Sequence, residues 1–208
     1  MENINDTTEE LQNLQVDKNT ISELASNLAK QHSSLVGLLN TRIQQLDFFY
    51  NNLEKYNLNE IISRKEIETI IVSAHGLSIN IEDTKASIDK LDYSKLFEKY
   101  DSYISASVEN NDNIDLDILG AEIHDEMQGF FKDTESIGAI IDVLTETYTT
   151  EVQIKIDGIL RRIKTANDKL EVILGDELKD ILDIKDTVVG MAENIIEEQE
   201  EIKTTQGE

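Results

Sequence analysis

The stretch Leu116–Ile202 decides the fold, and it reads LDILGAEIHDEMQGFFKDTESIGAIIDVLTETYTTEVQIKIDGILRRIKTANDKLEVILGDELKDILDIKDTVVGMAENIIEEQEEI. It runs about 85 residues without a proline, and an interior proline would cost a helix roughly 3 kcal/mol. Its apolar residues return at helical spacing, which predicts one long helix that begins at Asp115 or Asp117. The average spacing from Tyr148 to Ile195 is close to 3.6, which favours a helix straighter than a strict heptad coil.

Two shorter helical stretches precede this long one. From Leu11 to Tyr56, apolar residues alternate by three and four, which is typical of a coiled coil or a slender bundle. Such a row of positions along one face of a helix is called a seam here, and this row is the first seam. Residues 1–9 are expected to be a flexible lead-in, with a helix cap at Thr7 or Thr8.

Asn57-Leu58-Asn59 interrupts the first seam and predicts a tight connection, with Asn59 capping the next helix. So short a link indicates that the second helix runs back antiparallel to the first. Gly76 lies inside the second seam, where it weakens the helix without necessarily ending it. The positions of this second seam are Ile67, Ile70, Ala74, Leu77, Ile81, Thr84, Ile88 and Leu91. A kink or short break is expected near Asp92-Tyr93, where the apolar phase shifts. Residues 109–113 are polar, acidic and without periodicity, which predicts a loop.

The predicted fold is therefore all-α: an elongated antiparallel helical bundle or coiled coil of three long helices, with the third extended. The low hydrophobic content of 39% suits long helices with one narrow buried stripe. The predicted organisation is a lead-in at 1–9, a three-helix bundle at 10–165, a helical extension or fourth helix at 166–198, and a disordered acidic tail at 199–208.

The third helix is predicted to outrun its two neighbours, because a bundle with them covers it only to about residue 165. The apolar positions beyond that point need a cover, since an exposed apolar stripe is unfavourable in water. Either they form a stalk that pairs with another copy or a partner, or the chain folds back at Gly175-Asp176. The candidate interface residues are Leu170, Leu174, Leu178, Ile181, Val188 and Ile195.

Net charge limits the classes of partner. The chain carries −24, and residues 111–208 hold twenty-five acids and nine bases, or −16 of the total. Such a charge repels nucleic acid and anionic membrane surfaces and suits basic protein surfaces. No run approaches the ~18 apolar residues of a membrane span, and no cysteine is present for a disulfide. A cytoplasmic location, or one inside a particle assembled in the cell, is expected.

No pattern in the sequence predicts catalysis, a metal site or a cofactor. Of the three histidines, only His124 has acidic neighbours, and it lacks the His-Glu-x-x-His spacing of a metal site. The nine glycines are dispersed singly and form no phosphate-binding loop. We therefore expect no catalytic residue, no metal ligand and no cofactor in this chain.

Three polar residues interrupt the first seam: Lys18, His32 and Arg42. Such residues either fix the register and the choice of partner helix or extend their charged ends past the edge of the seam. We expect His32 to have its hydrogen bonds satisfied within the seam or to be partly exposed. The aromatic residues Tyr93, Phe97, Tyr100 and Tyr103 occur at helical spacing and are expected in the core rather than in a contact patch.

One basic cluster occurs in the acidic third helix. It is a candidate docking site for an acidic segment, such as the Glu run at 197–201, or an anion, although a solvated face with local ion pairs would have the same composition. Its members are Lys155, Arg161, Arg162, Lys164 and Lys169.

These features favour a non-enzymatic structural or assembly subunit, an oligomerising spacer or adaptor in a larger complex such as a virion or cytoskeletal assembly. Its partners would be other proteins or further copies of itself, as a homo-oligomer or within a hetero-complex. The alternative is an acidic inhibitor that imitates DNA or occupies a basic protein surface.

Overall fold

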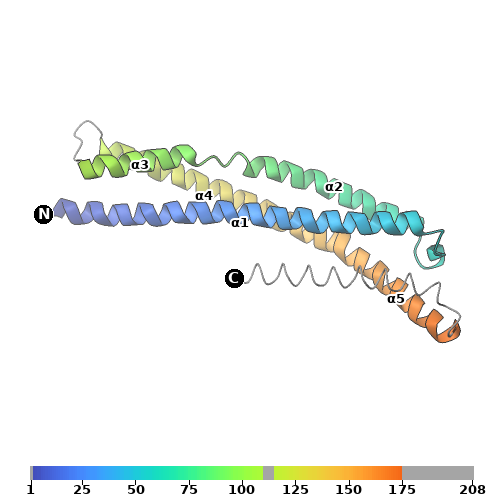
Figure 1. Ribbon diagram of the computed structural model, residues 1–208. Coiled ribbons are helices and arrows are strands. Elements are labelled where there is room, and N and C mark those ends of the chain that lie inside the picture. Colours follow the sequence, from blue (N-terminus) through green and yellow to red (C-terminus); the bar gives the residue numbers. More distant parts are fainter. Residues whose placement is uncertain (1, 110–114, 175–208) are drawn as a thin grey trace. The chain divides into compact units, whose positions relative to one another are not determined.

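The computed structural model describes residues 2–109 and 115–174, and these residues form helices without any strand, so the chain is all-α as expected. The long helices are α1 (Glu2–Asn52), α2 (Arg64–Ile88), α3 (Ser94–Glu109), α4 (Leu116–Thr147) and α5 (Ile154–Leu174) (Figure 1). A 3-10 turn, η1 (Leu58–Glu60), precedes α2. A π-helical segment, η2 (Tyr148–Gln153), joins α4 to α5 without a break.

The chain divides into two compact units. Unit 1 comprises the residues up to Ser33 together with Ile79–Thr145. Unit 2 comprises Ser34–Ser78 and the described residues from Glu146 onward. Both α1 and α2 therefore contribute one part to each unit.

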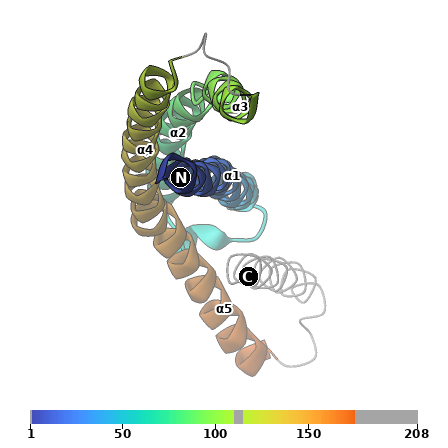
Figure 2. The same ribbon diagram turned by 90° about the vertical axis from the view of Figure 1, so that its left-hand side faces the viewer.

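In unit 1, three helical segments share one core. Ile21 of α1 packs with Leu96 and Tyr103 of α3 and with Ile123, Met127 and Phe130 of α4. Further along α1, Leu28 packs with Ile137 and Ile141 of α4 and with Ile88 at the end of α2. As α1 advances, its contacts move forward along α4 and backward along α3 and α2. The α4 segment thus runs parallel to α1, and α3 runs antiparallel to it (Figure 2).

In unit 2, the buried residues lie at the seam positions of α1 and α2, in the connection between these two helices, and along η2 and α5. The predicted seam of α2 is buried from Ile67 to Thr84, across both units. Gly76 lies inside α2 without ending it, as predicted. The buried apolar residues of unit 2 are Leu35, Leu39, Leu46, Phe49, Leu53, Leu58, Ile62, Ile67, Ile70, Ala74, Leu77, Tyr148, Val152, Ile156, Ile159 and Ile163.

Two predicted helix starts are wrong and one is confirmed. Helix α1 begins at Glu2, so its start is not capped at Thr7 or Thr8 and residues 2–9 are helical. Helix α2 is capped by Ser63, whose hydroxyl accepts from the Glu66 N–H at 3.2 Å, and not by Asn59. The Asp115 carboxylate accepts from the Ile118 N–H at 3.2 Å, which confirms Asp115 as the start of α4.

The predicted break near Asp92-Tyr93 is confirmed, because residues 89–93 separate α2 from α3. There the Asp92 carboxylate accepts from the backbone N–H and the hydroxyl of Ser94, and these bonds lower the pKa of Asp92. The aromatic group beyond the break belongs to the core, as expected. Tyr100 and Tyr103 are buried, and Tyr93 and Phe97 pack against the core of unit 1.

Candidate functional site

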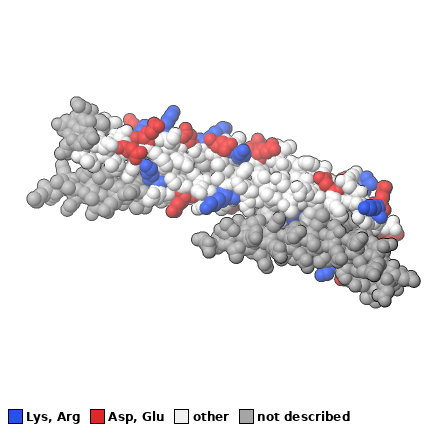
Figure 3. Space-filling model, viewed as in Figure 1, with Lys and Arg blue, Asp and Glu red and all other residues white. Residues whose placement is uncertain are grey.

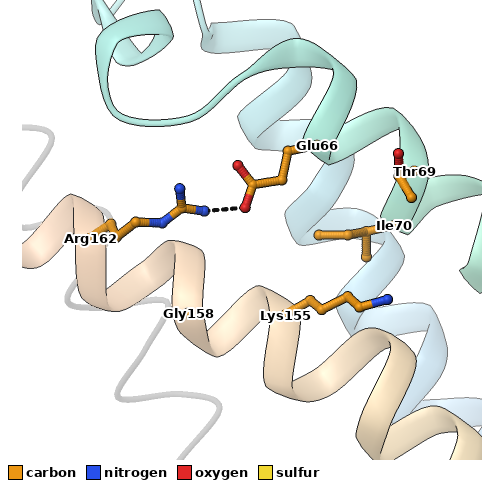
Figure 4. A pocket seen from close by; sticks show the side chains of 6 residues that line it. All are labelled: Glu66, Thr69, Ile70, Lys155, Gly158 and Arg162. Carbon is orange, nitrogen blue, oxygen red and sulfur yellow. Dashed lines mark hydrogen bonds and ion pairs between the residues drawn. The ribbon is translucent and has the colours of Figure 1, made fainter.

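A surface hollow of about 580 Å³ lies between α2 and α5 in unit 2 (Figure 4). Glu66, Thr69 and Ile70 line it from α2, and Lys155, Gly158 and Arg162 line it from α5. Its walls are thus one buried isoleucine, one glycine, one hydroxyl and three charged side chains. The hollow is a groove that a polar or acidic chain segment could enter.

Both cations of this groove already have acidic partners. Arg162 forms an ion pair with Glu66 across the groove, and its guanidinium also donates to the Ile61 carbonyl at 3.2 Å. Lys155 pairs with Glu151, one turn back along the helix. These charged side chains are between 39% and 49% exposed, so solvent screens the pairs and an incoming carboxylate could compete for the cations.

The structure gathers only part of the predicted basic cluster. Lys155 and Arg162 line the groove, whereas Arg161, Lys164 and Lys169 are exposed and are not among its lining residues. Arg161 and Lys164 lie on other faces of α5, because residues one or two positions from Arg162 do not share its face. Lys169 is two turns beyond Arg162 and therefore lies past the lining residues along the helix. On the face drawn in Figure 3, acidic and basic side chains are interspersed rather than gathered by sign.

The core of unit 2 contains a second polar feature, a cluster around Arg42. The Arg42 guanidinium lies 3.3 Å from a carboxylate oxygen of Asp157 and donates to the Gln45 side-chain oxygen at 3.0 Å. The Arg42 side chain is only 3% exposed and that of Asp157 is 33% exposed. Arg42 therefore does not extend past the seam edge; it is held inside the seam by an acid on α5.

Tyr148, the first residue of η2, completes this cluster. Burial raises the pKa of the Tyr148 phenol, while the nearby Arg42 guanidinium acts in the opposite direction. Among the described residues, neither the Tyr148 hydroxyl nor the Gln45 amide nitrogen has a hydrogen-bond partner of good geometry. Sequence reasoning identified Arg42 from its seam position but missed Asp157 as its partner, because a heptad pattern gives the face of a residue and not its contact in a distant helix.

The other two polar seam residues differ from Arg42. Lys18 is 31% exposed; its ammonium lies 4.8 Å from the centre of the Phe97 ring and pairs with Asp101 at 3.2 Å, so it extends past the seam edge. His32 is buried, and its Nε2 lies 3.1 Å from the Ile81 carbonyl, to which it donates. His32 is thus satisfied within the seam, as expected.

The acids around His124 are engaged with a lysine. Glu122 and Glu126 both pair with Lys99 of α3, and the bond to Glu126 is the chief cause that raises the pKa of Lys99. In the described part of the chain, no group of three or more histidine, aspartate or glutamate side chains is arranged to hold a metal ion. Nor is any described helix both long and apolar enough to cross a membrane.

The candidate interface falls mostly outside the described residues. Leu170 is half-buried at the end of α5, and the backbone of Leu174 ends that helix. Leu178, Ile181, Val188 and Ile195 lie outside the described residues, as does the choice between a stalk and a fold-back at Gly175.

Comparison with known proteins gives no family. No family model matches the chain, and neither a curated protein nor a solved structure matches it significantly.

Proposed function

We propose that this protein is a non-enzymatic structural or assembly subunit that associates through the apolar stripe of its third helical stretch. The observation that carries the proposal is that the apolar spacing continues in the sequence beyond the last buried residue of unit 2. Ile156, Ile159 and Ile163 are fully buried in unit 2, and the same helical spacing continues in the sequence from Leu170 to Ile195. An apolar stripe of this length favours burial against protein.

The described interior is consistent with a scaffold. A helix of 51 residues such as α1 is about 75 Å long, and in the part whose side chains are described its buried residues are seam residues apart from Gln45. The polar exceptions are bound within their own unit, as His32 is to Ile81 and Arg42 is to Asp157. Long helices with fixed contacts suit a spacer or adaptor that holds partners at a set distance.

The expected partners are further copies of the chain or other proteins. The net charge of −24 disfavours nucleic acid and anionic membranes. We place the subunit in the cytoplasm or inside a particle assembled there.

A double substitution on the stripe, Leu174→Asp with Leu178→Asp, tests this proposal. The matched control, Gln199→Asp with Thr204→Asp, adds the same two charges outside the apolar stripe. We expect the stripe variant to keep its helicity by circular dichroism and to fall to the monomer mass in light scattering, while the control assembles like the wild type. Assembly that survives the stripe substitutions would show that the association uses another surface, and the proposal would be wrong.

The fold-back at Gly175 predicts a different outcome for the same variants. In that arrangement the stripe is buried within one chain, so the wild type is already a monomer. The stripe variant would then lose thermal stability without any change of mass, and the assembly proposal would be wrong.

A second candidate is an acidic inhibitor that imitates DNA or occupies a basic protein surface. It is supported by the −16 of residues 111–208, of which eleven acids and three bases fall in residues 175–208 and leave −8 there. Such a protein should bind a basic target with an affinity that falls steeply between low and moderate salt. A complex that is insensitive to salt would exclude this function.

A further inference from the structure

The buried positions of α4 follow a strict heptad that slips by one residue at η2. Along α4 they alternate by four and three residues, and this spacing continued beyond Tyr148 would next reach 151, 155, 158 and 162. The residues that are buried beyond Tyr148 lie one position later than each of these expected positions. The two series are Ile123, Met127, Phe130, Thr134, Ile137, Ile141, Leu144 and Tyr148, and then Val152, Ile156, Ile159 and Ile163.

The π-helical segment lies at the point of the slip. It runs from Tyr148 to Gln153, and the Ile154 N–H that follows it bonds to the Thr149 carbonyl, five residues back instead of four. A π-helical turn takes up one residue more than an α-helical turn, so it can absorb an extra residue without rotating the helix beyond it. In an unbroken α-helix the same extra residue would rotate the following face by about 100°.

Threonine hydroxyls near η2 bond to the carbonyls of the preceding turn. The Thr145 hydroxyl donates to the Ile141 carbonyl at 2.8 Å, and the Thr150 hydroxyl donates to the Glu146 carbonyl at 2.9 Å. Such bonds from threonine to the preceding turn also occur in the regular helices of this chain, as from Thr41 to Gly37, and they can bend a helix slightly. Thr150 itself is exposed, so its side chain makes no contribution to the buried seam.

We infer that η2 holds a one-residue insertion in a heptad helix and that this insertion preserves the buried face of unit 2. Without the wider turn, Lys155, Gly158 and Arg162 would rotate into the seam in place of Ile156, Ile159 and Ile163. With it, Lys155, Gly158 and Arg162 line the groove, and Asp157 remains at 3.3 Å from the buried Arg42. The π-helix is therefore a conformational device that separates the groove face of α5 from its core face.

Single-residue deletions in the full chain test this inference. Deletion of Thr150 should convert η2 into regular α-helix and join the two heptads into one. We expect the Thr150 deletion to retain its helical circular dichroism signal, with a melting temperature within about 4 °C of the wild type.

Deletion of Ser136, an exposed residue of α4, is the matched control. It moves Gly138 and Asp142 into the places of Ile137 and Ile141, and the shift continues to Tyr148. We expect this control to lower the melting temperature by more than about 10 °C. If the Thr150 deletion lowers the melting temperature by more than half as much as the Ser136 deletion does, η2 does not hold a removable insertion and the inference is wrong.

Discussion

The ion pair of Arg42 and Asp157 predicts that a second core substitution can restore stability that a first one removes. Substitution of Asp157 by alanine leaves the Arg42 guanidinium, which is 3% exposed, without a counter-charge in the core. Removal of one partner of a buried ion pair costs about 3–5 kcal/mol, and the depth of Arg42 places this variant in that range. Arg42 keeps its bond to the Gln45 oxygen, which does not neutralise the charge.

Adding Arg42→Met to Asp157→Ala should restore stability. The double variant removes the stranded charge and replaces it with an apolar side chain of similar length, a type of exchange that is often neutral or stabilising relative to a buried pair. It leaves the Gln45 oxygen unpaired, which costs about 1–3 kcal/mol. We therefore expect the double variant to be more stable than Asp157→Ala alone, although it carries one more core substitution.

Urea unfolding followed by circular dichroism measures this cycle, with the slope m checked for each variant. The control cycle uses Glu151→Ala and Lys155→Met, an exposed pair on the neighbouring turns, where each change should cost no more than about 0.5 kcal/mol. If the double variant is less stable than Asp157→Ala by the full cost of Arg42→Met, the two sites are independent. The Arg42 charge would then not be held by Asp157, and the account of the core of unit 2 would fail.

Three further predictions concern single positions. A Cβ at Gly76 meets no atom within 4 Å, so Gly76→Ala should stabilise the chain by about 0.5–1 kcal/mol in urea unfolding. At Gly120 the added Cβ lies 3.4 Å from the Tyr103 ring, so the gain from Gly120→Ala should be smaller. An equal loss of stability at both positions would contradict this prediction. Asn57 has a φ of 54°, so Asn57→Gly should be more stable than Asn57→Ala by about 1 kcal/mol, and a more stable alanine variant would be inconsistent with the left-handed turn. Burial raises the pKa of Tyr148 above its unfolded value of about 10, so the unfolded state loses the phenol proton first and stability falls as the pH rises past that value. Tyr148→Phe should therefore show a weaker loss of stability between pH 9 and 11. An identical loss in the wild type and the variant would show that this phenol does not contribute.

The helical class and the buried faces could be predicted from the sequence because apolar spacing reports them directly. The seam of α2 was predicted position by position, from Ile67 to Thr84. Helix ends were harder to predict where several capping residues compete. Asn57, Asn59 and Ser63 are all suitable caps by type, but Asn57 takes the left-handed turn, η1 occupies Leu58–Glu60, and the cap of α2 falls to Ser63.

The π-helix could not be anticipated from an average. A mean spacing near 3.6 from Tyr148 onward suggested a straight helix, but the buried residues follow two strict heptads separated by one extra residue. The contrast between the series ending at Tyr148 and the series beginning at Val152 was present in the sequence. The apolar stripe of the sequence contains the buried positions from Ile137 to Ile163, but a mean spacing does not show where one extra residue enters.

The candidate site was only partly predictable. Composition identified the basic residues of α5, but which of them share a groove depends on the facing helix. Glu66, Thr69 and Ile70 of α2 form the other wall of the groove that Lys155 and Arg162 line. Similarly, the position of Arg42 in the seam indicated a special role, whereas its partner Asp157 lies 115 residues further along the chain.

The molar mass of the wild-type protein in solution shows whether copies of the chain associate. The monomer is 23.6 kDa, and light scattering on a sizing column, repeated over a tenfold range of concentration, gives the mass of the species present. The assembly proposal predicts a discrete dimer, trimer or larger oligomer. A monomer at every concentration would contradict self-association through the stripe from Leu170 to Ile195.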